Sequence, residues 1–314
     1  MRSAIKEILK AIEENVLDRK EQIEVSNFRK IDAKDHGKSI AFVDGGNAEI
    51  IKAPNFSLQF IRTCAVVFKA NKKKECIKNE FFSLTYAVGE LKDIIYRTKI
   101  FLSKGSAPDE KDLCFSCLDR TIKQGTEKAN ISVVGGIARR FAELALASDA
   151  KADIIVIDGN LKPVYSNEDK YVEMLLKKGS VVCAVAKTSD ILTSKGNCPV
   201  SQLNSMNLEH AWHYPTNRRH FAKLNKSSDY VFSIETSNEK DAGLVISQLA
   251  SNSNDAVFAG YPYGLMLADR LARISNEEKD RMSLLFKTLA GKKWDRIRHY
   301  VNAANSHSVL DRIC

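Results

Sequence analysis

The sequence lacks the features that mark membrane and secreted proteins. No apolar run in its 314 residues approaches the roughly 20 consecutive residues that a membrane-spanning helix needs. Residues 1–20 form a charged, helix-like pattern and lack the apolar core of a signal peptide. We therefore expect a cytoplasmic protein that does not associate with membranes.

The cysteines lack the pattern of a disulfide framework or a zinc site. The chain has seven of them, an odd number in a long sequence, so reduced thiols are expected. Cys114 and Cys117 form one CxxC within a helix-like stretch, but no second pair follows. Because a structural zinc takes about four ligands, we interpret this pair as two small apolar residues of a helix.

The sequence also lacks internal repeats, low-complexity segments and a clear linker. Its length and its 44% hydrophobic content allow one large domain or two small ones. We predict a single domain over residues 1–314. It begins with an amphipathic helix within residues 1–21, continues as a core over about 39–275, and ends in a helical segment over 276–314.

Positive charge, in contrast, is plentiful. The formal net charge is +9, and basic residues cluster at positions 72–74, 139–140, 218–220 and 292–293. Each cluster alone is typical of a solvated face, whereas together they favour a polyanionic partner such as DNA.

The order of elements predicts a mixed α/β sheet. Strand-like runs over 39–44, 56–70 and 80–88, with turns at 45–47 and 71–74, indicate an antiparallel meander. Helical periodicity over 109–127, 131–148 and 168–178 then alternates with buried strands over 153–157 and 180–187, which indicates a parallel crossover. Further strands are expected over 230–235 and 256–260, and helices over 241–250, 265–274 and 277–290. This mixed order is what a ribonuclease-H-like fold requires, although other α/β folds share it.

Two aspartates end two of the apolar runs. Asp44 follows Ile40–Val43, and Asp158 follows Ile154–Ile157. Singly, an Asp-Gly after a strand is ordinary turn chemistry. As a pair, two carboxylates at the carboxyl ends of buried strands can converge at one edge of a sheet, where α/β sites form. Hard divalent ions that assist phosphodiester hydrolysis need such converging carboxylates.

A divalent-metal site of this kind needs a third carboxylate, and a helix is the next place to look for it. Glu143 lies at the edge of the buried stripe of the 131–148 helix, so it is a candidate ligand. Periodicity alone favours a solvent-exposed partner of Arg139 or Arg140 instead. Glu90, just after the third strand, competes for the same role.

The remaining candidates each have an ordinary alternative. Asp269 could be a fourth ligand or a surface acid paired with Arg273 at i, i+4. Tyr261 could contact a phosphate or be a half-buried aromatic residue. Lys187 could bind the scissile phosphate or be a surface lysine. Arg140 is a second candidate phosphate contact.

These motifs together resemble those of NurA nucleases. The resemblance is carried by residues 42–46 (FVDGG), 157–161 (IDGNL), 186–188 (AKT) and the run from Gly260-Tyr261-Pro262 to Asp269, and it spans roughly residues 39–275. It implies a ribonuclease-H-like core, a toroidal homodimer, and Mn²⁺- or Mg²⁺-dependent cleavage of DNA. It also implies a role in archaeal DNA-end processing with the hexameric HerA translocase.

By position, the resemblance makes Asp44, Glu143 and Asp158 the metal-binding acids. Tyr261 matches a tyrosine associated with activity, and Asp269 stands where some members have histidine. The sequence departs from the family in two ways. Gly46 replaces the more usual serine of Asp-Gly-Ser, and the long interval between Asp44 and Glu143 indicates an insertion within residues 70–130.

Two other functions remain open. The same fold could serve as a non-catalytic adaptor that docks on the translocase. A phosphatase is a third possibility, but its nucleophile normally lies in Asp-x-Asp, and neither Asp-Gly motif has a second aspartate two residues on.

Overall fold

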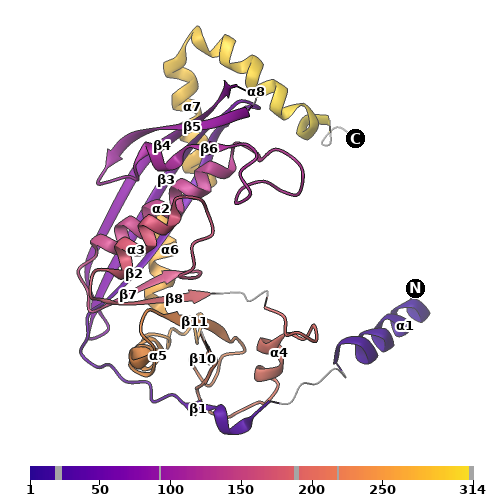
Figure 1. Ribbon diagram of the computed structural model, residues 1–314, viewed down its shortest axis with the longest axis vertical. Helices are drawn as coiled ribbons and strands as arrows, with labels where there is room; N and C mark the ends of the chain where they lie inside the picture. The colour runs from indigo at the N-terminus through magenta and orange to yellow at the C-terminus, as the bar shows by residue number, and fades with distance from the viewer. Residues whose placement is uncertain (18–22, 92, 187–190, 218, 311–314) are drawn as a thin grey trace. The chain divides into compact units, whose positions relative to one another are not determined.

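The computed structural model describes residues 1–17, 23–91, 93–186, 191–217 and 219–310 (Figure 1). The chain divides into two compact units. The core unit comprises Gly37–Ile157, Leu161–Val182 and Gly264–Cys314, and the flanking unit comprises Met1–His36, Asp158–Asn160 and Cys183–Tyr263. No helix among the described residues is both long enough and apolar enough to cross a membrane.

The core unit is built on a mixed sheet in the order β7-β2-β3-β4-β5-β6. Its strands are β2 (Ile40–Lys52), β3 (Phe56–Lys69), β4 (Lys72–Glu90), β5 (Asp93–Lys104), β6 (Phe115–Ser116) and β7 (Ile154–Asp158). Strands β2 to β6 form an antiparallel meander, and β7 pairs in parallel with β2. The predicted mixed sheet is confirmed, with longer strands and with β5 and β6 as unpredicted members.

One predicted turn is wrong, because β2 runs straight through residues 45–47. Gly45 pairs with Thr63 and Gly46 with Arg62, in unbroken register with β3. The glycines are needed there for close packing, as described below. The true turn between β3 and β4 is the two-residue link Ala70-Asn71, where both residues have positive φ angles, as a tight hairpin requires.

The predicted helix over 109–127 is also wrong. This stretch contains a short 3₁₀ turn, η3 (Glu110–Leu113), then β6 and turns. Leu113, Phe115 and Cys117 are buried, whereas Cys114 and Leu118 are exposed. Burial therefore alternates with the period of an extended chain, so Cys114 and Cys117 do not share a helix face.

Helix α2 (Val133–Asp149) lies along β2, β3 and β4, as Figure 1 shows, and confirms the predicted helix. Its apolar stripe of Ile137, Phe141 and Leu144 is fully buried. Helix α3 (Glu168–Leu176) packs beside it, and strand β8 (Val181–Ala186) follows in the chain. Both agree with the predicted helix and strand.

Three helices end the core unit: α6 (Tyr263–Ala272), α7 (Asn276–Ala290) and α8 (Lys293–Leu310). Helix α7 begins at a capping Ser275, whose hydroxyl accepts from the backbone N–H of Glu278 at 3.1 Å. Apolar residues of α7 and α8, including Met282, Phe286 and Trp294, pack against a cluster on β2 and β3. The predicted helices over 265–274 and 277–290 are confirmed.

The flanking unit contains the antiparallel strands β1 (Arg29–Lys30), β9 (Trp212–Pro215), β10 (His220–Lys223) and β11 (Phe232–Thr236), of which β11 pairs with β8. Its helices are α1 (Arg2–Ile12), continued by the π-helical turn Glu13–Leu17, then α4 (Pro199–Asn204) and α5 (Ala242–Ser251). The predicted strand over 256–260 is wrong. Asp255 accepts the backbone N–H groups of Val257 and Phe258 there, which folds the chain into a turn.

Two adjacent glycines of α2 allow a matched test of this packing. A Cβ at Gly135 would lie 2.1 Å from Gln59 Cδ, whereas one at Gly136 would meet nothing within 4 Å. The Gln59 amide is held by Ser132 O at 2.7 Å and by Asn47 Nδ2 at 2.7 Å. We predict that Gly135→Ala destabilises the protein by about 1–3 kcal/mol through overpacking.

Gly136→Ala should instead be neutral or stabilising by up to about 1 kcal/mol, because alanine favours a helix interior. Urea unfolding of both variants measures the difference. Equal stabilities would contradict the close packing of α2 on β3.

Candidate active site

Asp44 lies where the pairing partners of β2 change. Up to Val43, β2 pairs in parallel with β7, and Val43 stands opposite Ile157. From Asp44 onward, the described part of the chain gives β2 only its antiparallel partner β3, with Asp44 opposite Cys64. The Asp44 side chain is 5% exposed, and its Oδ1 accepts the backbone N–H of Gly45 at 2.7 Å. The carboxylate is thus buried at a position where one side of the strand has no ladder partner.

Helices cover both faces of β2 at this point. A Cβ at Gly45 would lie 2.5 Å from Glu143 Oε1 on α2. A Cβ at Gly46 would lie 2.5 Å from the carbonyl oxygen of Ala272 on α6, and one at Gly264 would lie 2.0 Å from the Phe42 ring. Since side chains alternate along a strand, α2 covers the Gly45 face, and α6 covers the face that Asp44 shares with Phe42 and Gly46.

Glu143 is buried on the α2 face. Its side chain accepts a short charge-assisted hydrogen bond from Arg139 Nη1, and the same Arg139 atom lies 3.2 Å from the carbonyl oxygen of Gly45. The expectation of an Arg139 partner is confirmed, but the pair is not solvent-exposed, because Glu143 is 5% exposed. The backbone at Gly45 therefore lies against Glu143, while the Asp44 side chain leaves β2 on the opposite face, which α6 covers.

Glu90 cannot substitute for Glu143. It ends β4 and forms an ion pair with Arg97 on β5. The β4 residue in line with Asp44 and Cys64 is Lys78, twelve positions before Glu90. At about 3.3 Å per strand residue, Glu90 lies about 40 Å along the sheet from that row.

Asp158 is the last residue of β7 and is half-buried. It follows directly on Ile157, just as Asp44 follows directly on Val43, the residue paired with Ile157. Gly159 has a φ of +99°, a conformation that L side chains rarely adopt, and its N–H donates to the Val185 carbonyl at 3.1 Å. The turn that the sequence predicts at Asp158-Gly159 is therefore confirmed.

Arg140 is engaged within the core unit. Its Nε donates to Glu168 Oε1 at 2.9 Å, and Glu168 is 1% exposed. The other oxygen of Glu168 accepts the backbone N–H groups of Val164 and Tyr165. The pair thus fixes the turn that leads into α3, and phosphate binding by Arg140 would compete with it.

The other candidates fall in different surroundings. Asp269 pairs with Arg273 at 2.6 Å near the end of α6, as the i, i+4 spacing predicts. Tyr261 is buried, with its ring 5.1 Å from that of Phe232 and 6.3 Å from that of Phe258. Lys187 lies outside the described residues. The roles of these three residues in binding or catalysis stay predictions.

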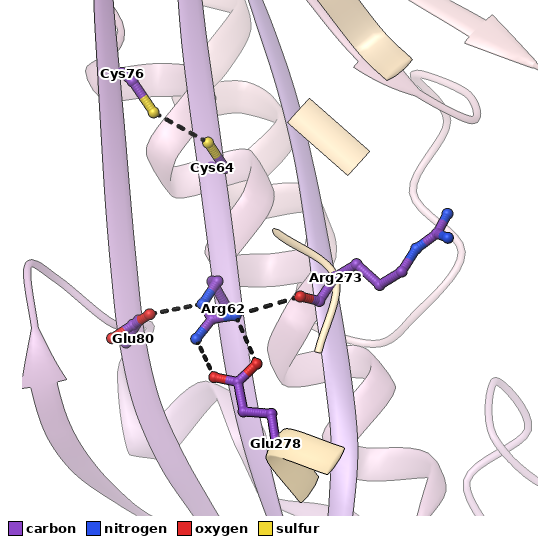
Figure 2. Close-up of polar contacts among 6 residues, drawn as sticks. All are labelled: Arg62, Cys64, Cys76, Glu80, Arg273 and Glu278. Carbon is purple, nitrogen blue, oxygen red and sulfur yellow. Dashed lines mark hydrogen bonds and ion pairs between the residues drawn. The ribbon is translucent and has the colours of Figure 1, made fainter. Parts of the chain in front are cut away.

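Several polar residues lie on the same face of the sheet as Asp44, and the sequence alone did not identify them as part of the site. Figure 2 shows Arg62 of β3 between Glu80 of β4 and Glu278 of α7, at 2.6 and 2.5 Å, with a further bond of 3.2 Å to the carbonyl oxygen of Arg273. These bonds raise the pKa of Arg62 and lower that of Glu278. Arg62 stands opposite Gly46, so this network lies beside the candidate site and ties α7 to the sheet.

Cys64 and Lys78 complete a row across the sheet from Asp44. Cys64 stands opposite Asp44 on β3, and Lys78 stands opposite Cys64 on β4. Their positions depend on strand register, which no local motif in the sequence encodes. Among the described residues, no three His, Cys, Asp or Glu side chains are grouped so that they could hold a metal ion.

Comparison with solved structures identifies the fold. The chain matches the NurA nuclease from Sulfolobus solfataricus with a TM-score of 0.55 and 13% sequence identity, over 93% of this chain and 95% of that one. This chain has the NurA fold. The ribonuclease-H-like mixed sheet predicted from the sequence is thereby confirmed, and so, at the level of fold, is the resemblance to NurA nucleases.

Other matches are more distant. Ciona intestinalis endonuclease V, in complex with inosine-containing DNA, matches with a TM-score of 0.40 and 12% identity over 77% of this chain and 90% of that one. The catalytic domain of human endonuclease V also matches with a TM-score of 0.40. The sequence identity is 11%, and the match covers 90% of this chain and 96% of that one. TM-scores this low say nothing about function. No protein-family model and no curated protein matches the sequence.

The close packing at Gly46, where the sequence resemblance leads one to expect a serine, yields a prediction. A serine there would press its Cβ against the Ala272 carbonyl, which is backbone and cannot rotate away. We expect Gly46→Ser to destabilise the protein by about 1–3 kcal/mol. Gly89→Ser is the matched control, because Gly89 lies on β4 and no described atom stands within 4 Å of a Cβ placed there. Thermal unfolding compares the two, and an unchanged melting temperature for Gly46→Ser would show that α6 does not pack against β2 here.

The Arg62 network yields a pH prediction. Arg62 lowers the pKa of Glu278 below its unfolded value, so the ion pair stabilises the fold at neutral pH. This stability is lost as the pH falls through the folded pKa of Glu278.

We expect Glu278→Gln to lower stability at pH 7 and to flatten the loss of stability below about pH 4.5. Glu173→Gln breaks only the exposed ion pair with Lys177. It should change little either the stability at pH 7 or the loss of stability at low pH. Denaturant unfolding between pH 3 and 7 checks this, and parallel curves for wild type and Glu278→Gln would contradict it.

Proposed function

We propose that this protein is a metal-dependent deoxyribonuclease of the NurA type. The observation that carries the proposal is the NurA fold over 93% of the chain, together with aspartates directly after the paired residues Val43 and Ile157. Adjacent parallel strands run about 4.8 Å apart, so acids that directly follow a pair of opposed residues are suited to share a cation.

The two aspartates fit a hard divalent ion in their chemistry, and we propose that Asp44 and Asp158 hold Mn²⁺ or Mg²⁺. Glu143 does not fit as it stands, because its carboxylate is paired with Arg139 on the other face of β2. It would join the ligand set only by leaving Arg139. When bound, such an ion supplies an activated water and stabilises the leaving oxygen of a phosphodiester.

The residues around Asp44 suit a polyanionic substrate. Lys78 lies on the same face, two strands away through Cys64, and is half-buried. At about 4.8 Å between strands, its backbone is about 10 Å from that of Asp44, so its ammonium can reach a phosphate that contacts the aspartate. We propose that Lys78 joins Lys187 in binding the DNA backbone, and that Tyr261 and Asp269 contribute to catalysis.

The finer role rests on the resemblance to the NurA family. We propose 5′–3′ exonuclease and single-strand endonuclease activity, a homodimeric state and cooperation with a HerA-type hexameric translocase. The process would be the resection of DNA ends during double-strand break repair by homologous recombination. The net charge of +9 supports DNA as the partner.

A cleavage assay tests the proposal. Asp44→Asn and Asp158→Asn should each reduce Mn²⁺-dependent cleavage of labelled single-stranded and duplex DNA by more than about 100-fold. Even groups that only orient a metal ligand are worth 10–100-fold. Glu173→Gln, an exposed carboxylate on α3, should retain wild-type activity. DNA binding by the two aspartate variants, measured by fluorescence anisotropy, should persist.

Two outcomes would overturn the nuclease proposal. Full activity in either aspartate variant would remove the assigned acids. DNA binding without cleavage in the wild type, with Mn²⁺ or Mg²⁺ and with a HerA-type translocase added, would instead favour the non-catalytic adaptor.

A further inference from the structure

Two cysteines on neighbouring strands of the core unit touch each other. Figure 2 shows Cys64 of β3 and Cys76 of β4 with their sulfur atoms 3.6 Å apart. A disulfide bond measures about 2.0 Å between sulfurs, so the two atoms need to close by about 1.6 Å. Side-chain rotation and a small adjustment of the strands can supply a movement of this size.

The backbone already holds the pair in place. Cys64 stands opposite Lys78 and Val66 opposite Cys76, so the two cysteines are diagonal neighbours on one face of the sheet. The hairpin turn at Ala70-Asn71 joins the two strands directly. A β-bulge between Val67 and Phe68 lies close by, and bulges locally increase strand twist. No distant segment has to move for the bond to form.

The two thiols differ in access to solvent. Cys76 is exposed, whereas Cys64 is fully buried. A dissolved oxidant therefore meets Cys76 first, and Cys64 is the thiol within reach to complete the reaction. An exposed cysteine beside a second thiol is the arrangement of redox-sensitive pairs.

We propose that Cys64 and Cys76 form a reversible disulfide that makes this hairpin an oxidation site. A peroxide oxidises the Cys76 thiol to a sulfenic acid, and water leaves. The Cys64 sulfur then attacks the Cys76 sulfur, the S–S bond forms, and water leaves with the Cys64 proton. One peroxide accepts the two electrons that the two thiols lose. A small dithiol reverses the bond by thiol–disulfide exchange.

The site lies beside the candidate active site. Cys64 is the direct cross-strand neighbour of Asp44, and opposed residues of an antiparallel pair have Cβ atoms about 5 Å apart. Any shift of Cys64 toward β4 therefore acts on the strand position that borders the Asp44 carboxylate. If the proposed nuclease function holds, oxidation should change cleavage activity severalfold, and a dithiol should restore it.

Mass spectrometry tests the bond without reference to activity. The folded protein is treated with one to a few equivalents of hydrogen peroxide, and the remaining thiols are alkylated before digestion with trypsin. The expected product joins the peptides of residues 63–69 and 75–78, because trypsin cuts after Arg62, Lys69, Lys74 and Lys78. The intact mass should fall by about 2 Da, and dithiothreitol should restore it.

Three variants sharpen the test. Cys64→Ser and Cys76→Ser should each abolish the joined peptide, and Cys64→Ser should leave Cys76 open to overoxidation, with a gain of about 32 Da. Cys114→Ser removes another exposed cysteine and should leave the joined peptide unchanged. The proposal fails if wild-type Cys76 is overoxidised while Cys64 stays alkylatable, or if Cys76 joins a different cysteine.

The activity measurement is separate. If the joined peptide forms but wild-type cleavage is unchanged by oxidation, the oxidation site stands and its link to Asp44 is wrong. If the wild type does not cleave DNA under reducing conditions, the nuclease proposal fails while the disulfide result remains valid.

Discussion

The candidate site depends on the close approach of two helices to one strand. Helix α2 brings Glu143 against Gly45 from one face of β2, and α6 brings the Ala272 carbonyl against Gly46 from the other. Neither position can hold a side chain without a displacement. Asp44, the residue before these glycines, is consequently buried beneath α6 at the point where β7 stops pairing with β2. The Gly-Gly pair is thus a packing requirement that places the acid.

Charge around this strand is balanced by pairing. Arg139 neutralises Glu143 on the α2 face, Arg140 neutralises the buried Glu168, and Arg62 serves Glu80 and Glu278 on the α6 face. Buried charges that lose their partner are strongly destabilising, so Arg140–Glu168 holds α3 to α2 and Arg62–Glu278 holds α7 to the sheet. The Arg139–Glu143 pair also explains why Glu143 is less suited than the two aspartates to bind a cation. Recruitment of Glu143 would leave Arg139 to find another anion, and a DNA phosphate would be one.

The sequence predicted the parts of this arrangement that local periodicity encodes. The apolar runs before Asp44 and Asp158 and the buried stripe of Ile137, Phe141 and Leu144 gave the strands and the main helix correctly. Local sequence patterns gave wrong predictions where residues typical of a turn or a helix occur in extended chain. Gly45-Gly46 resembles a turn but allows helix packing, and the stretch around Leu113, Phe115 and Cys117 alternates in burial despite a helix-like spacing. The row Asp44, Cys64 and Lys78 arises from register between distant strands, so no pattern within one segment could reveal it.

The central claim is that the carboxylates of Asp44 in β2 and Asp158 at the end of β7 bind a catalytic divalent cation. The most direct measurement is anomalous scattering from crystals of the protein soaked in Mn²⁺. The account predicts an anomalous peak within coordination distance of the carboxylate oxygens of Asp44 and Asp158. Manganese bound only elsewhere in crystals of an active protein, with no peak at Asp44, would contradict it.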